Sequence, residues 1–197
     1  MAFNINKFKS GALPQGGARP SQFDLHITGP LSLGGRALDQ TTLAQSPLVC
    51  RAASLPASAI GTIEIPYFGR KIKLAGDRVV SSWQVTVMND EDFGVRSMFE
   101  MWSNAINTIE SNVRLPVGEL SYKSEIDVNQ YGKNGIAELP VRSYKMIGAF
   151  PTIIGPIQLD WNATDQIEVY DVTFEMDYWL PDIGNALNRY SGQELSA

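Results

Sequence analysis

The chain has 197 residues, 44% of them hydrophobic and 19% charged, a balance typical of a globular domain with a substantial core. Its net charge is −5, and an acidic chain lacks the clustered lysines and arginines that hold nucleic acid by its phosphates. Because Cys50 and His26 are its only cysteine and histidine, the sequence excludes an intrachain disulfide and argues against histidine-based metal sites and most hydrolytic catalysis.

Targeting and catalytic motifs are absent from the sequence. No run of eighteen apolar residues could span a membrane, and the first ten residues lack the apolar core of a signal peptide, so we expect synthesis in a cytoplasm. Phosphate-binding glycine loops, a nucleophile elbow and a zinc-binding helix motif are missing as well. The sequence therefore predicts no cofactor, no metal and no enzymatic activity.

The first residues with a clear pattern follow a flexible start. Glycine and proline recur in residues 1–20, which predicts an N-terminal arm before a single β-domain over 21–180. Phe23, Leu25 and Ile27 alternate with polar residues, the period of a half-buried strand. His26 falls on the polar face of this strand and is interpreted as a solvated or interface histidine, in preference to a catalytic one.

A loop is expected over residues 29–46, centred on two glycines. Leu48, Cys50 and Ala52 then predict a second strand, in which Cys50 serves as a small apolar filler more readily than as a reactive thiol.

Residues 60–78 form the next unit. Pro66 and Gly69 interrupt its alternating pattern, which indicates an edge strand or a bulge. Its basic side chains could form a phosphate-binding patch, but they lack interleaved aromatic residues. A solvated face, or a contact surface for acidic residues of a neighbouring subunit, is the preferred interpretation. The basic residues are Arg70, Lys71, Lys73 and Arg78.

Residues 83–88 alternate as a strand, and a helix is predicted over about 91–110. Asn89 or Asp90 is expected to cap this helix, with acids at 90–92 at the positive end of its dipole. A metal or acid–base cluster is the weaker interpretation of these three acids. The helix has one apolar stripe, formed by Val95, Phe99, Trp102, Ile106 and Ile109.

Further strands are predicted at 126–128 and 141–147, separated by a turn at 132–135, and a bend is expected over 148–156. Residues 157–161 alternate once more. The last strand is expected to be the longest, with apolar side chains from Tyr170 to Tyr178 on one face. Its other face carries Asp171, Thr173, Glu175 and Asp177, a ladder that should face solvent or an aqueous channel. A short polar tail follows over 181–197.

Together these elements predict a mainly β protein, an antiparallel β-sandwich or partial barrel with one packed α-helix.

Two sequence blocks resemble the tail tube protein of contractile-tailed bacteriophages. The first runs from the R-K-I-K-L-A-G-D-R string at 70–78 into W-Q-V-T-V-M-N-D-E at 83–91. The second combines I-Q-L-D-W at 157–161 with residues 167–179, which close on Asp177, Tyr178 and Trp179. Weaker similarity lies at residues 19–20 and 50–56. The chain departs from the family in a longer loop at 29–46 and in the tail after Trp179.

This resemblance implies hexameric rings, in which each subunit gives strands to a continuous inner β-barrel. The rings would stack inside a contractile sheath as the conduit for DNA ejection. Implied partners are other copies of the chain, the sheath, baseplate and tail terminator proteins, and passing double-stranded DNA without specific binding. The implied location is the virion.

The resemblance also suggests residue roles. The segment 60–77 resembles an extended hairpin or loop that reaches adjacent subunits. Its candidate inter-subunit contacts are Arg70, Lys71, Lys73, Arg78, Tyr67 and Phe68. The candidate lumen-facing residues are Asp171, Glu175 and Asp177, with Asp160 as a weaker one.

Three alternatives remain open at the level of sequence. The same fold could serve as the inner tube of a phage-derived contractile injection system or as a baseplate tube initiator. A monomeric ligand-binding β-sandwich would show no self-assembly. An enzyme using acidic residues would lose activity on substitution of a single carboxylate.

Overall fold

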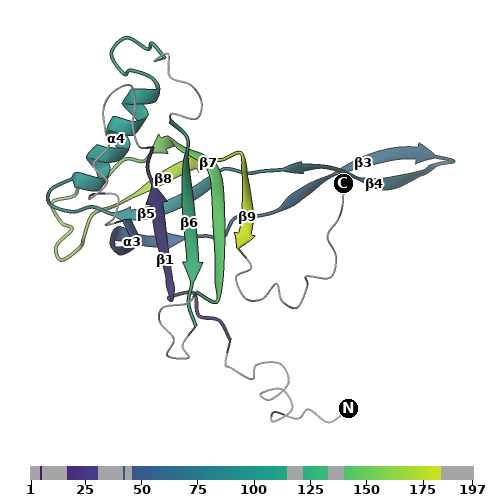
Figure 1. Cartoon of the computed structure of the whole chain (residues 1–197), viewed down its shortest axis with the longest axis horizontal. Coiled ribbons are helices and arrows are strands. Elements are labelled where there is room, and N and C mark those ends of the chain that lie inside the picture. Colours follow the sequence, from purple (N-terminus) through teal and green to yellow (C-terminus); the bar gives the residue numbers. More distant parts are fainter. Residues whose placement is uncertain are drawn as a thin grey trace.

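A computed structural model describes residues 17–30, 46–114, 122–132 and 140–182, together with positions 5 and 42 (Figure 1). Its elements, in chain order, are β1 (Phe23–Thr28), α3 (Ser46–Val49), β2 (Cys50–Ala53), β3 (Ala59–Tyr67), β4 (Arg70–Val79), β5 (Trp83–Met88), α4 (Gly94–Ile106), β6 (Ser124–Gln130), β7 (Arg142–Ile154), β8 (Val169–Glu175) and β9 (Tyr178–Asp182). The expected loop at 29–46, the turn at 132–135 and the terminal segments lie largely outside these residues.

Seven strands form one antiparallel sheet in the order β1-β6-β7-β8-β5-β2, with β9 also paired to β7. Strand β7 joins two parts of this sheet, because residues 142–149 pair with β6 and residues 150–154 pair with β8. Gly148, between the two parts, has a φ of 70°. The sheet therefore bends around the core, and the predicted antiparallel partial barrel with one packed helix is confirmed.

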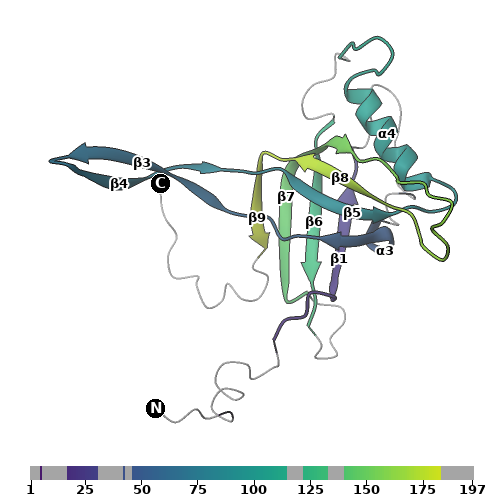
Figure 2. The same ribbon diagram turned by 180° about the vertical axis from the view of Figure 1, so that it is seen from behind.

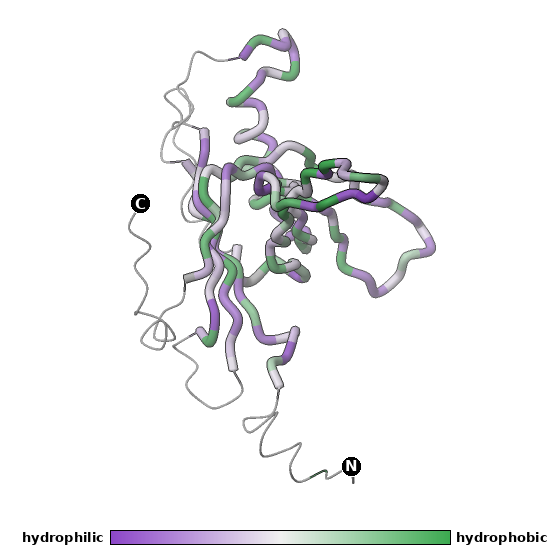
Figure 3. Tube along the Cα trace, turned by 90° about the vertical axis from the view of Figure 1, so that its right-hand side faces the viewer, coloured by the Kyte–Doolittle hydropathy of each residue, from purple (hydrophilic) through white to green (hydrophobic). Residues whose placement is uncertain are grey.

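Apolar side chains from the bent sheet and from α4 form a single core. Hydrophobic and hydrophilic positions follow one another along the strands (Figure 3), and in β1 the side chains of Leu25 and Ile27 are buried as predicted. Helix α4 packs through Phe99 and Trp102, whose rings lie 5.8 and 6.4 Å from that of Phe174 in β8. The alternation in the sequence thus places one face of each body strand in the core.

The helix is shorter than predicted. It ends at Ile106, and Ile109 beyond it is 82% exposed and not part of the buried stripe. The predicted cap is wrong: the N-cap residue is Phe93, with a φ of 51° and no side-chain hydrogen bond to the helix. Asp90 instead closes a turn before the helix, accepting the Glu91 N–H on Oδ1 and the Phe93 N–H on its carbonyl.

The C-terminal third also departs from the sequence prediction. Residues 155–168 contain no strand, and Trp161 is fully exposed. The predicted last strand is divided into β8 and β9, and the longest strand is β7 with 13 residues. The division occurs where the Asp177 N–H donates to the carbonyl of Ile147, 3.0 Å away, and the chain passes from residues 150–154 of β7 to residues 143–147 of the same strand.

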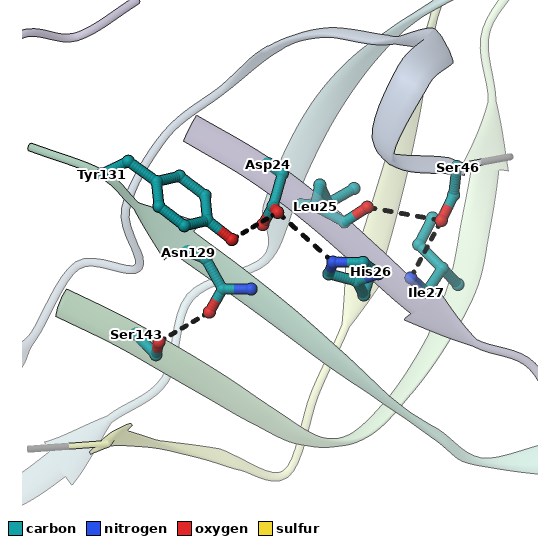
Figure 4. Close-up of polar contacts among 8 residues, drawn as sticks. All are labelled: Asp24, Leu25, His26, Ile27, Ser46, Asn129, Tyr131 and Ser143. Carbon is teal, nitrogen blue, oxygen red and sulfur yellow. Dashed lines mark hydrogen bonds and ion pairs between the residues drawn. The ribbon is translucent and has the colours of Figure 1, made fainter. Parts of the chain in front are cut away.

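The second strand is likewise shorter than expected, because residues 46–49 form α3 and only Cys50–Ala53 pair with β5. Ser46 of α3 accepts the Ile27 N–H and donates to the carbonyl of Leu25 (Figure 4). Cys50 is buried, and burial raises the pKa of its thiol to about 12, which suits an unreactive filler. Within the described residues, no helix is long and apolar enough to cross a membrane.

Strands β3 and β4 form a separate two-stranded hairpin that extends far beyond the body (Figures 1 and 2). Its loop is Phe68 and Gly69, both with positive φ (43° and 76°), the pattern of a tight type I′ turn. We call this hairpin, residues 59–79, the arm. It confirms the extended hairpin that the resemblance implied.

Candidate functional site

The arm has one apolar face and one polar face. Directly paired residues share a face, so Ile63 with Leu74, and Ile65 with Ile72, lie on the apolar side. These four side chains are 45–54% exposed, and Tyr67 beyond them is 61% exposed. Large apolar side chains are normally buried, so a contiguous row of them on a projecting hairpin indicates a contact surface.

The polar face of the arm is held by ion pairs within the hairpin. Glu64 accepts a hydrogen bond from Lys71 at 2.7 Å, and the Lys73 ammonium lies 3.9 Å from the same carboxylate. Both lysines, predicted as inter-subunit contacts, therefore already have a partner in their own chain. Arg78 donates to the Ser58 hydroxyl near the base of the arm.

The tip of the arm collects the other predicted contact residues. Phe68 is 90% exposed, and its ring packs edge-on against that of Tyr67 with centroids 4.6 Å apart. Arg70 pairs across the turn with Tyr67 and has no salt-bridge partner within the described residues. The sequence thus placed these residues on one element, but only the structure separates the apolar side, the tip and the internally paired lysines.

The four carboxylates predicted to face a lumen do not form one ladder. Asp171 and Glu175 lie on the exposed face of β8, where Asp171 accepts a 2.6 Å hydrogen bond from Thr86. Asp177 lies in the bend before β9 and pairs with Lys123 at 2.8 Å. Asp160 lies in an exposed turn and accepts the Asn162 N–H at 2.9 Å. Only Asp171 and Glu175 share a strand face.

A second acidic face, on β1 and β6, was missed at the sequence level. Asp24 pairs across the strands with Asn129, and Thr28 pairs with Glu125. Glu125 also lies 2.6 Å from the Lys145 ammonium of β7. The alternation of residues 125, 127 and 129 as Glu, Asp and Asn was the signal that could have revealed this face.

Asp24 is the centre of a polar cluster on that face (Figure 4). The Tyr131 hydroxyl donates to its Oδ2 at 2.7 Å, and His26 Nε2 lies 3.3 Å from the same oxygen. The hydrogen bond to Asp24, followed by burial and the carboxylate charge, raises the pKa of Tyr131 to about 12.

An open pocket of about 630 Å³ lies at the turn before α4 and the segment 166–168. Phe93 and Ile167 supply its apolar walls, and Asp90, Glu91 and Glu168 supply its carboxylates. Among the described residues, no group of three histidine, cysteine or carboxylate side chains could hold a metal. Asp90 and Glu91 therefore line the pocket, whereas Asp92 lies in the turn before α4, and within the described residues these acids belong to no metal-binding group.

Comparison with known proteins places this architecture in one family. The phage tail tube protein family matches residues 18–181. The tail tube protein gp19 of Enterobacteria phage T4 is 35% identical over 130 residues, 66% of this chain and 78% of that protein. The tail tube protein of Serratia phage KSP90 is 25% identical over 167 residues, 82% of this chain and 87% of that protein.

Solved structures share the fold at much lower identity. A chain of the sheath–tube complex of an extracellular contractile injection system (PVC) in its extended state has a TM-score of 0.54 and 14% identity, and the match covers 91% of this chain and 98% of that one. A chain of the anti-feeding prophage baseplate has a TM-score of 0.58 and 9% identity, with 84% and 95% covered. From the family match and the T4 relative, the chain belongs to the phage tail tube protein family and is a structural subunit of a contractile phage tail.

Proposed function

We propose that this subunit forms hexameric rings, that the rings stack inside a contractile sheath, and that the resulting tube conducts double-stranded DNA during ejection. The exposed apolar face of the arm carries this proposal. An arm of this kind gains stability when a second copy covers it, because burying apolar surface is favourable by about 25 cal/mol per Å². The outer edges of β1 and β2 offer further backbone groups for pairing between subunits.

The proposed partners follow from the contexts in which the same fold is found. Chains with this fold occur in a sheath–tube complex, in a sheath/tube terminator and in a baseplate. We propose that this chain likewise contacts a sheath, a baseplate and a tail terminator, and that it has no catalytic activity and no cofactor. As a tail component it belongs to the virion, and we propose that it assembles in the host cytoplasm.

The predicted residue roles become proposals about the tube. Tyr67, Phe68 and Arg70 are proposed to contact a neighbouring subunit directly, with Lys71, Lys73 and Arg78 supporting the arm. Asp171 and Glu175 are proposed to face the bore, since both are exposed on one face of β8. Asp177 and Asp160 have weaker support, because one is ion-paired to Lys123 and the other lies in a turn.

A second candidate function is the inner tube of a phage-derived contractile injection system. It is favoured by the shared fold with the PVC and anti-feeding prophage chains. The T4 tail tube protein, at 35% identity, favours the phage tail. Genes for a capsid and a terminase beside this one would support the phage tail, and their absence would support the injection system.

Electron microscopy of negatively stained protein over a concentration series tests the assembly. We expect six-fold rings or stacked tubes from the unchanged chain. Ile65→Lys, on the apolar face of the arm, should abolish them while circular dichroism of the monomer stays unchanged. The matched variant Thr62→Lys, on the opposite face of the same strand, should still assemble. Monomers alone, even after a baseplate is added as a nucleus, would contradict the proposal.

A further inference from the structure

The tip of the arm and the pocket beside α4 lie at opposite ends of the molecule. Figures 1 and 2 show the arm extending along the long axis in one direction, while α4 and the start of β8 lie toward the other end. The tip therefore cannot enter the pocket of its own chain. Any contact between the two must join different molecules.

The chemistry of the tip is aromatic and cationic. Phe68 is 90% exposed at the turn, with Tyr67 against its edge. On the neighbouring strand lies the guanidinium of Arg70, which has no salt-bridge partner among the described residues. Exposed aromatic and arginine side chains together are the typical anchors of protein interfaces.

The pocket offers the complementary chemistry. Phe93 and Ile167 are 44% and 69% exposed, so the apolar walls of the pocket remain accessible to solvent in the monomer. Glu91 at its rim is exposed and has no salt-bridge partner within the described part of the chain. No lysine or arginine lines the pocket among the described residues. The pocket is thus apolar and acidic, whereas the tip is apolar and basic.

We propose that the tip of one subunit's arm inserts into this pocket on a second copy of the chain, with Phe68 between Phe93 and Ile167 and with Arg70 paired to Glu91. The inference rests on the proposed tube assembly and names the surface that receives the arm. The contact is heterologous, because one end of each subunit meets the other end of the next, and such contacts repeat to build closed rings or stacked arrays.

Disulfide trapping between two separately purified variants tests the contact. Phe68→Cys and Ile167→Cys subunits are mixed, assembled and oxidised, and we expect a crosslinked dimer that neither variant forms alone. The buried native Cys50 should not compete. Phe68→Cys mixed with Leu180→Cys is the control, since Leu180 is 51% exposed on β9, outside the pocket lining.

The outcomes separate this inference from the assembly proposal. Tubes with a crosslink only in the Phe68/Ile167 mixture support both. Tubes without that crosslink, or with an equal one in the control, overturn the pocket contact and leave the tube function intact. An unchanged chain that never assembles contradicts the tube function, and the pocket contact with it.

A charge exchange gives a second readout. Arg70→Glu should raise the protein concentration needed for assembly about tenfold or more, because close charge pairs at interfaces contribute about 1.5 kcal/mol or more. Glu91→Arg in the same chain should restore assembly toward the original concentration. Failure of the double variant to recover, with each monomer still folded, would contradict the pairing of Arg70 with Glu91.

Discussion

At the scale of single residues, Phe174 joins the sheet to the helix. Its ring lies 5.8 Å from those of Trp83 and Phe99 and 6.4 Å from that of Trp102, and the side chain is fully buried. We predict that Phe174→Ala lowers the free energy of unfolding by about 3–5 kcal/mol, through lost burial and the cavity left behind. Urea unfolding of the monomer measures this change.

Leu159→Ala is the matched control, because Leu159 is 79% exposed. Its effect should stay within about 0.5 kcal/mol. Comparable losses in the two variants would show that the ring cluster does not dominate the core.

Tyr131 gives a pH-dependent prediction. Its pKa is raised from 10.0 to about 12, chiefly by its hydrogen bond to Asp24. The folded state therefore keeps the phenol proton more tightly than the unfolded state does. The resulting stabilisation is complete below pH 10 and is lost as the pH rises toward 12. Tyr131→Phe should be less stable than the unchanged chain at neutral pH, and this difference should shrink above pH 10.

Urea unfolding at a series of pH values compares each variant with the unchanged chain. The alkaline titration of Cys50 and Tyr170 affects both proteins equally, so it cancels in the difference between their free energies of unfolding. Tyr67→Phe is the control, because the Tyr67 hydroxyl has no hydrogen bond within the described residues. A stability difference for Tyr131→Phe that stays constant up to pH 12 would contradict the proposed linkage to Asp24.

At the scale of elements, the bend of β7 depends on Gly148. Its φ is 70°, and a Cβ at this position would overlap the carboxylate of Asp177, which is held by Lys123. Gly69 also has a positive φ, but nothing lies within 4 Å of a Cβ there. Gly69→Ala should therefore cost only backbone strain, about 1–2 kcal/mol. Gly148→Ala should cost more, because the Asp177 side chain must move as well.

Thermal or urea unfolding of both glycine variants measures the difference, and Asp177→Ala combined with Gly148→Ala should recover part of the additional loss. Equal losses at the two glycines would mean that Asp177 shifts without cost. In that case the bend is fixed by the backbone alone.

Sequence patterns correctly predicted the elements in which the regularly spaced apolar side chains do pack into the core. Strands β1 and β5 were predicted by alternation, and the apolar stripe of α4 was right up to Ile106. The same alternation misled at 157–161, because Leu159 and Trp161 are apolar yet exposed. Periodicity reports which side chains are apolar, and it cannot distinguish a side chain that faces the core from one on the surface.

Long-range contacts account for other differences. The separation of β8 from β9 depends on the hydrogen bond from Asp177 to Ile147, thirty residues earlier in the chain. The carboxylate ladder was therefore correct for Asp171 and Glu175 as neighbours, but Asp177 belongs to the bend. The internal pairing of Lys71 and Lys73 with Glu64 also needs the hairpin register, which residue types alone do not supply.

At the scale of the whole molecule, the acidic surface bears on the proposed passage of DNA. Residues 151–197 contain one base and eight acids, and Glu175 from this region is exposed on β8 without a salt-bridge partner among the described residues. DNA carries one phosphate per ~1.7 Å of axis, and screening confines repulsion to about 8 Å at physiological salt. Carboxylates on the bore would thus prevent the duplex from adhering to the wall without opposing its movement along the centre.

Glu175→Lys tests this argument by placing cations along the proposed bore. We expect phage carrying the variant to eject DNA more slowly, with the defect relieved as salt is raised, because added salt weakens attraction between lysine and phosphate. Ejection triggered in vitro and followed by a DNA-binding dye measures the rate.

Glu110→Lys is the matched control, since it makes the same charge change at an exposed position after α4. Equal slowing in both variants would attribute the effect to net charge. Unchanged ejection in Glu175→Lys, with slowing instead in Thr28→Lys, would assign the bore to the face formed by β1 and β6.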